Sequence, residues 1–167
     1  MEEFTKRKTP RWQSYDYNDP GAYFITICTE SKAKILSKIV GTGVLDCPQV
    51  VLTSYGKVAD KYLNQLNDFY DYIKVDSYVI MPNHIHIMLF IYPHGQSGTP
   101  VPTRAHSAFL HFISTFKRFC NNEYGHNIWQ SRSNDHIIRN REDYEKHLNY
   151  IYENPMKWTL DEFYSEE

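Results

Sequence analysis

The sequence predicts an α+β domain of ferredoxin-like type, a sandwich in which helices lie on one face of an antiparallel or mixed sheet. Apolar residues alternate with a period of two in several short segments and recur every three to four residues in longer ones. In chain order these segments give β-α-β-β-α-β-α, an order typical of that class. The chain of 167 residues fits one domain, 1–167, with an N-terminal arm (1–20), a loop (92–104) and an acidic C-terminal tail (156–167).

The first half of the chain alternates strand and helix patterns. After the polar arm, Ala22–Thr29 is rich in β-forming residues and alternates, so we expect a strand. Two short β-like runs within 34–51 surround Gly41-Thr42-Gly43, which indicates a hairpin or a loop insertion. Leu52–Phe69 has helical spacing, and Thr53 or Ser54 can cap its start.

The second half continues the pattern. Ile73–Ile80 and Ile85–Ile91 are predicted strands, and proline and glycine between 92 and 103 predict a loop. Arg104–Tyr124 carries one apolar stripe and is predicted to be an amphipathic helix. Asp135–Arg139 is a candidate short strand, and Asp143–Asn154 is a predicted helix that ends before a proline.

Composition excludes some classes of protein. Hydrophobic residues make up 41% of the chain and charged residues 23%, which is typical of globular domains. No apolar run approaches the roughly 20 residues that span a bilayer, and the N-terminus lacks the apolar stretch of a secretory signal. The three cysteines are scattered, which suits a reducing compartment. We therefore expect a cytoplasmic protein with no membrane partner.

Charge is distributed unevenly along the chain, although the formal net charge is only −2. The middle of the chain, 104–141, is rich in lysine and arginine, and the segment from 142 to the end is rich in acids. The middle could therefore present a basic surface to phosphate groups, although ordinary solvated faces would give the same pattern.

His84 and His86 are two residues apart on a predicted strand. Period-two geometry points both imidazoles from the same face, while Ile85, Ile87 and Leu89 point into apolar packing. Neutral imidazole is a common ligand for divalent metals, but a metal needs at least one further ligand from elsewhere. Without such a partner, two structural histidines would explain the motif better.

The last predicted helix could supply that partner. Asp143, His147, Tyr150 and Asn154 fall on one stripe of the helix, whereas Tyr152 lies off the Asn154 face. A tyrosine hydroxyl can attack a phosphodiester and form a covalent phosphotyrosine, and a metal can polarise the phosphate. The amide oxygen of Asn154 would complete a set with the two imidazoles for Mg²⁺ or Mn²⁺. An aromatic residue on a helix is more often part of the core, so Tyr150 gains weight only from the histidines.

Together these segments resemble a known family. MPNHIHIML is similar to the HUH strand of single-tyrosine transposases, and NIWQSRSNDHIIRNREDYEKHLNYIYENPMKW resembles the C-terminal signature of the REP-associated tyrosine transposases. DPGAYFITICT matches their first strand. The resemblance implies an HUH endonuclease domain that cuts single-stranded DNA beside a hairpin, through a 5′-phosphotyrosine and a free 3′-OH. It assigns His84, His86 and Asn154 to a divalent metal, Mg²⁺ or Mn²⁺, and Tyr150 to nucleophilic attack.

The predicted partner is therefore single-stranded DNA with a hairpin, in the cytoplasm of a prokaryotic cell and near the nucleoid. Candidate DNA contacts are Lys117, Arg118, His136, Arg139 and Arg141, each of which could also be an ordinary surface charge. Both a homodimer and a monomer fit the sequence, and the role of His147 is open.

Two rival functions remain. One is a non-catalytic nucleic-acid-binding relative with the same fold. The other is a metallohydrolase that activates water, which ranks last because the sequence shows no obvious extra carboxylate near His84.

Overall fold

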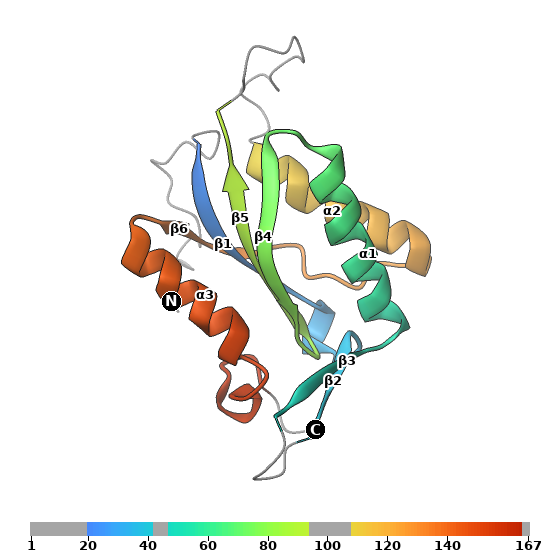
Figure 1. The fold of residues 1–167 in the computed structure, drawn as a ribbon. Coiled ribbons are helices and arrows are strands. Elements are labelled where there is room, and N and C mark those ends of the chain that lie inside the picture. Colours follow the sequence, from blue (N-terminus) through green and yellow to red (C-terminus); the bar gives the residue numbers. More distant parts are fainter. Residues whose placement is uncertain (1–19, 42–46, 94–107, 165–167) are drawn as a thin grey trace, which may run out of the picture.

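A four-stranded antiparallel sheet lies at the centre of the molecule (Figure 1). The computed structural model describes residues 20–41, 47–93 and 108–164 of the chain. The strands of the central sheet are β1 (Gly21–Cys28), β4 (Ile73–Ile80), β5 (His84–Ile91) and β6 (Asn134–Ile138), in the order β4-β5-β1-β6. The other elements are a hairpin of β2 (Ser37–Val40) and β3 (Gln49–Leu52), helices α1 (Ser54–Phe69), α2 (Ala108–Tyr124) and α3 (Arg141–Glu153), and short 3-10 turns η1 (Glu30–Lys32) and η2 (Trp158–Leu160).

The path β1-α1-β4-β5-α2-β6, with β5 and β1 in the middle of the sheet, is the ferredoxin-like arrangement. The α+β class is therefore confirmed, and the predicted strands and helices are found with small shifts at their ends. The start of the helix expected over Arg104–Tyr124 lies outside the described residues. So do nearly all of the N-terminal arm (1–20) and most of the loop (92–104).

Local sequence signals explain where the helices begin. The Thr53 side chain accepts a hydrogen bond from the Gly56 amide at 3.2 Å and caps α1. Asn140 does the same for α3, where its side-chain oxygen accepts from the Asp143 amide at 2.8 Å. α3 ends before Pro155, because a proline restricts the residue before it and cannot continue the backbone ladder.

The two faces of the sheet bury different partners. On one face, Ile25 and Ile27 of β1 and Ile85 and Ile87 of β5 pack in a large core that includes residues of α1 and α2. On the other face, residues of β1 and β5 pack against Ile151 of α3 in a smaller cluster: Phe24, Met88 and Ile151.

Figure 1 shows α1 and α2 on one side of the sheet and α3 on the other. The expectation of helices on one face therefore holds for α1 and α2, whereas α3 lies opposite them. An apolar stripe requires burial but does not specify which face of a sheet supplies it. Because α1 and α2 already cover one face, α3 buries its stripe on the other, which is the face that carries the imidazoles.

Two expectations from composition can be checked on the described residues. None of the helices in that part of the chain is long and apolar enough to cross a membrane. The three cysteines are free thiols, with Cys28 and Cys120 buried and Cys47 exposed.

Candidate metal and nucleophile site

The histidine pair lies on β5 and faces α3. His84 is fully buried, His86 is 1% exposed, and their ring centroids are 4.5 Å apart. Their neighbours Ile85 and Ile87 are buried on the opposite face, as the period-two pattern predicted. The sheet therefore places two imidazoles side by side in an interior position.

The imidazole of His84 is held in one tautomer. The side-chain nitrogen of Asn83 donates to the carbonyl oxygen of Phe163 at 2.8 Å, which fixes the orientation of the Asn83 amide. The Asn83 oxygen therefore accepts from Nδ1 of His84 at 2.8 Å, and Nδ1 must carry the proton. Nε2 of His84 is left as a lone-pair nitrogen, which is the form that binds metals.

His86 has an equivalent support. Its Nδ1 lies 2.9 Å from the hydroxyl of Thr26, the residue paired with it on β1. A hydroxyl can donate or accept, so His86 can keep its proton on Nδ1 and present Nε2 as an acceptor. Among the described residues, neither Nε2 of His84 nor Nε2 of His86 has a hydrogen-bond partner.

Burial keeps both imidazoles neutral. It lowers the pKa of His84 from 6.5 to about 4, against an opposing influence of Asp161. Burial, together with the charges of His84 and His147, holds the pKa of His86 well below its ordinary value. Neutral imidazoles with free Nε2 atoms in an interior position are suited to coordinate a cation.

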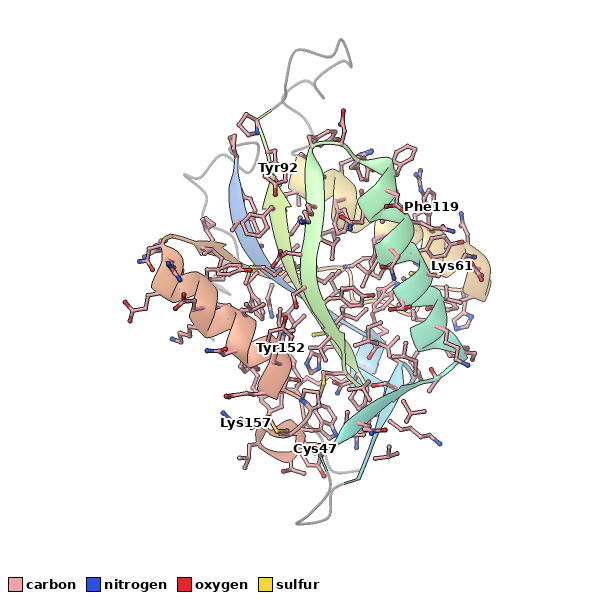
Figure 2. The ribbon with its side chains drawn as sticks, viewed as in Figure 1. Cys47, Lys61, Tyr92, Phe119, Tyr152 and Lys157 are labelled. Carbon is pink, nitrogen blue, oxygen red and sulfur yellow. The ribbon has the colours of Figure 1, made fainter. Side chains whose placement is uncertain are left out.

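α3 brings the predicted tyrosine and asparagine to the same place. The ring of Tyr150 meets that of His86 edge-on, with centroids 5.1 Å apart. Asn154, at the end of the helix, is 2% exposed, and its side-chain oxygen has no partner among the described residues. Tyr152 is 65% exposed on α3 (Figure 2), which agrees with its predicted position off the Asn154 face.

Asp161 is a member of this site that sequence reasoning missed. Its Oδ2 accepts hydrogen bonds from the hydroxyl of Tyr150 at 3.1 Å and from the side-chain nitrogen of Asn154 at 2.7 Å. One donor atom each from His84, His86 and Asp161 lie within 4.8 Å of one another. Burial, and then the charge and hydrogen bond of Asp161, raise the pKa of the Tyr150 hydroxyl above its ordinary value.

Asp161 belongs to the segment expected to be an acidic tail (156–167). Its described part instead folds back over the imidazoles after a turn that includes Lys157 (Figure 2) and η2. The ring of Phe163 lies 4.7 Å from that of His84, and Trp158 lies 5.9 Å from it. These aromatic contacts pack the segment against the imidazoles. The aromatic residues between its acidic residues are the sequence signal that could have indicated this packing.

A pocket of about 560 Å³ opens beside the nucleophile candidate. That volume is in the range of small-molecule and nucleotide sites. Its lining includes residues from the sheet, α3 and the C-terminal segment: Phe24, His86, Lys146, His147, Asn149, Tyr150, Glu153 and Glu162.

The predicted DNA contacts fall into two groups. Lys117 and Arg118 are on α2, on the other face of the sheet from α3, and Nζ of Lys117 donates to the carbonyl oxygen of Gln130 at 2.8 Å. Both line a groove of about 430 Å³.

His136, Arg139 and Arg141 lie around the start of α3. Arg139 and Arg141 line a pocket of about 360 Å³, and Arg141 also pairs with Glu145 at 2.8 Å. His136 is bound to Asp143 instead, with its Nε2 2.9 Å from Oδ2 of the carboxylate. A role of these five residues in DNA binding stays a prediction.

Comparison with known proteins agrees with this geometry. No family model matches the chain. It is 32% identical to the REP-associated tyrosine transposase of Escherichia coli over 84 residues, which cover 50% of this chain and 45% of that protein. It is 26% identical over 150 residues to a Haemophilus influenzae protein that carries the same name provisionally. That match covers 85% of this chain and 74% of the relative.

A solved structure of a REP-associated tyrosine transposase bound to a REP hairpin has a TM-score of 0.61 and 21% identity to this protein. The match covers 96% of this chain and 76% of that chain. The sheet order defines a ferredoxin-type domain with two imidazoles on a central strand. The named relatives narrow the comparison: the chain resembles the REP-associated tyrosine transposases, and this resemblance supports a transposase-like function.

Proposed function

We propose that this protein is a metal-dependent enzyme that nicks and rejoins single-stranded DNA beside a hairpin, with Tyr150 as its nucleophile. The observation that carries the proposal is a set of three buried polar atoms, on residues grouped around Asp161, that have no hydrogen-bond partner among the described residues. They are Nε2 of His84, Nε2 of His86 and Oδ1 of Asn154. Orphaned polar atoms are costly to bury, and a shared cation would satisfy all three.

The donor set fits a divalent cation such as Mg²⁺ or Mn²⁺. Two neutral imidazoles and an amide oxygen are the ligands proposed from the sequence, and the carboxylate of Asp161 is an additional candidate. When bound, the cation would polarise a phosphate oxygen and offset the negative charge that develops there. Asn83 and Thr26 would support the ligands through the Nδ1 atoms of the imidazoles.

Tyr150 would perform the covalent step. Its hydroxyl oxygen attacks the phosphorus, the new Tyr–O–P bond forms, and the bond from phosphorus to the 3′ oxygen breaks. The hydroxyl proton leaves Tyr150 and the 3′ oxygen is released as a 3′-OH, while the 5′ end stays on the protein. The reverse attack by a 3′-OH rejoins the strand. The substrate class is proposed from the family, one of whose members was solved with a REP hairpin.

A labelled single-stranded hairpin oligonucleotide tests the nucleophile. We expect wild type to become covalently attached to the DNA in the presence of Mn²⁺, and Tyr150→Phe to bind the DNA without attachment. Tyr152→Phe is the matched control, because Tyr152 is exposed on the same helix two residues away and should leave attachment unchanged. Attachment of the Tyr150→Phe protein would show that the nucleophile is a different residue.

A second candidate function is a metallohydrolase that activates water and forms no covalent link. Asp161 favours it more than the sequence did, because a carboxylate now stands beside His84 and His86. Mass spectrometry of the reacting protein separates the two functions. A free 5′-phosphate with no protein adduct at any time would select the hydrolase, whereas metal-independent binding with no nicking would select a non-catalytic DNA-binding module.

A further inference from the structure

A second group of metal-capable side chains lies at the start of α3. His136 projects from β6, and Asp143 and His147 are one turn apart on the helix. Phe24, the cross-strand neighbour of His136, separates this group from the first. Its ring centroid lies 5.1 Å from that of His86 and 4.7 Å from that of His147.

The donor atoms of this group lie close enough together to share one ion. Oδ1 of Asp143 lies 3.1 Å from Nε2 of His136 and 3.1 Å from Nδ1 of His147. With metal–donor bonds of about 2.1 Å, two ligands at a right angle are about 3.0 Å apart. The imidazoles of His136 and His147 are stacked, with centroids 4.5 Å apart and 19° between their planes, so the rings must turn before the lone pairs of both point at one ion.

We propose that His136, Asp143 and His147 form a second divalent-cation site. Two imidazoles and one carboxylate suit ions such as Zn²⁺ or Mn²⁺. Three protein donors leave coordination positions open for water or for an oxygen of a bound molecule.

Hydrogen bonds hold this group together when no ion is bound. Binding of an ion must therefore displace the protons that form those hydrogen bonds. In that arrangement Nε2 of His136 and Nδ1 of His147 each carry a proton toward Asp143. An ion takes the place of both protons when each neutral imidazole moves its proton to its other ring nitrogen. Nδ1 of His147 also lies 2.8 Å from the backbone oxygen of Asp143, so binding there would exchange that contact for the ion.

The neighbouring pocket carries a net negative charge that the second ion would offset. His147 lines the pocket that Tyr150 also lines, and the charged residues in that lining are Lys146, Glu153 and Glu162. A phosphate group entering this pocket would meet more negative than positive charge. A divalent cation held by His147 and Asp143 would offset that negative charge at the wall of the pocket. The existence of this site does not depend on the proposed nicking reaction.

Metal titration of the full chain tests the site. After removal of metals with a chelator, Zn²⁺ and Mn²⁺ are titrated by calorimetry into wild type and into variants of each group. We expect two ions per wild-type chain, one ion for Asp143→Asn and for His136→Gln, and one ion for the double variant His84→Ala/His86→Ala. His126→Gln is the matched control, because His126 is exposed away from both groups and should leave two ions bound.

Binding of no ion by the wild-type chain would overturn the second site, and so would unchanged ion binding in both Asp143→Asn and His136→Gln. If Asp143→Asn fails to fold, His136→Gln decides alone, because its side chain is 43% exposed on an edge strand and tolerates exchange. The double variant reports separately on the first group. Loss of the proposed nicking function would therefore be distinguished from loss of the second site.

Discussion

The hydroxyl of Tyr150 donates a hydrogen bond to Oδ2 of Asp161 across 3.1 Å, and the same oxygen accepts from the Asn154 side chain. The carboxylate therefore contacts both candidate site residues of α3. It is also grouped with His84 and His86. Whatever binds among the imidazoles must share or displace this carboxylate, so Asp161 is the first residue whose charge should be varied.

Asp161→Asn should weaken divalent-cation binding. The substitution keeps an acceptor for Tyr150 but removes a negative charge beside the two imidazoles. We expect a loss of affinity for Mn²⁺ on the order of 10- to 100-fold, as for other residues that support metal ligands. Calorimetric titration measures it. Glu162→Gln is the control, since it removes the same charge one residue away, and an equal loss in both variants would show a general charge effect.

The free energy of unfolding should decrease as the pH is lowered, and part of this decrease should come from His84. Its pKa is about 4 in the folded protein, mainly because of burial, against 6.5 ordinarily. As the pH falls from 6.5 to 4, the unfolded chain takes up a proton that the folded chain refuses. The free energy of unfolding therefore decreases, by at most about 1.4 kcal/mol per pH unit for this group.

His84→Gln should remove that contribution. Urea denaturation in a chelator at several pH values measures it, and the variant should lose less stability than wild type between pH 6.5 and 4. His126→Gln, at an exposed position, should follow wild type. Parallel pH profiles for wild type and His84→Gln would contradict the buried neutral state of this imidazole.

Asn83 should hold both the proton on Nδ1 of His84 and the position of the C-terminal segment. Asn83→Ala leaves Nδ1 of His84 without its acceptor and the Phe163 carbonyl without its donor. An unsatisfied buried group costs about 1–3 kcal/mol. We therefore expect lower stability, weaker cation binding and faster amide exchange of residues 158–164.

Asn83→Asp separates the two effects of Asn83. A carboxylate still accepts from His84 but cannot donate to Phe163, so cation binding should persist while exchange of 158–164 stays fast. Wild-type exchange rates in both variants would show that Asn83 does not hold the segment in place.

Ile151 should fix α3 on the sheet. It is 2% exposed and packs with Phe24 and Met88 beneath Tyr150. Ile151→Ala should lower the free energy of unfolding by about 2–4 kcal/mol through lost burial and a residual cavity. Thermal or urea denaturation measures it. Leu160→Ala, at a position 83% exposed, should change stability little.

The sequence was sufficient to predict the elements and half of the site. The alternation around His84 and His86 identified both a strand and the face of that strand. The spacing of Tyr150 and Asn154 identified one stripe of a helix. These are local signals, because periods of 2.0 and 3.6 residues belong to the backbone itself. The structure places these predicted residues together, while their catalytic roles remain proposals.

Other features depended on contacts between distant segments. Asp161 reaches the imidazoles through a chain reversal after α3, and no periodicity relates it to Tyr150. The face of the sheet that α3 covers depends on where α1 and α2 already lie. The contact of His136 with Asp143 needs the edge position of β6, which a sequence pattern does not specify. Sequence patterns therefore do not predict the strand order or the chain reversal after α3 that complete these groups of residues.

The alternation of isoleucine and histidine along β5 also fixes the register of this strand against β1. A slip of one residue against β1 would turn Ile85 and Ile87 toward α3 and drive both imidazoles into the apolar interior. In that register both imidazoles would lose their partners Asn83 and Thr26, and each unsatisfied buried polar group costs about 1–3 kcal/mol. Strand pairing that satisfies the interior therefore also places the two imidazoles side by side on the face that α3 covers.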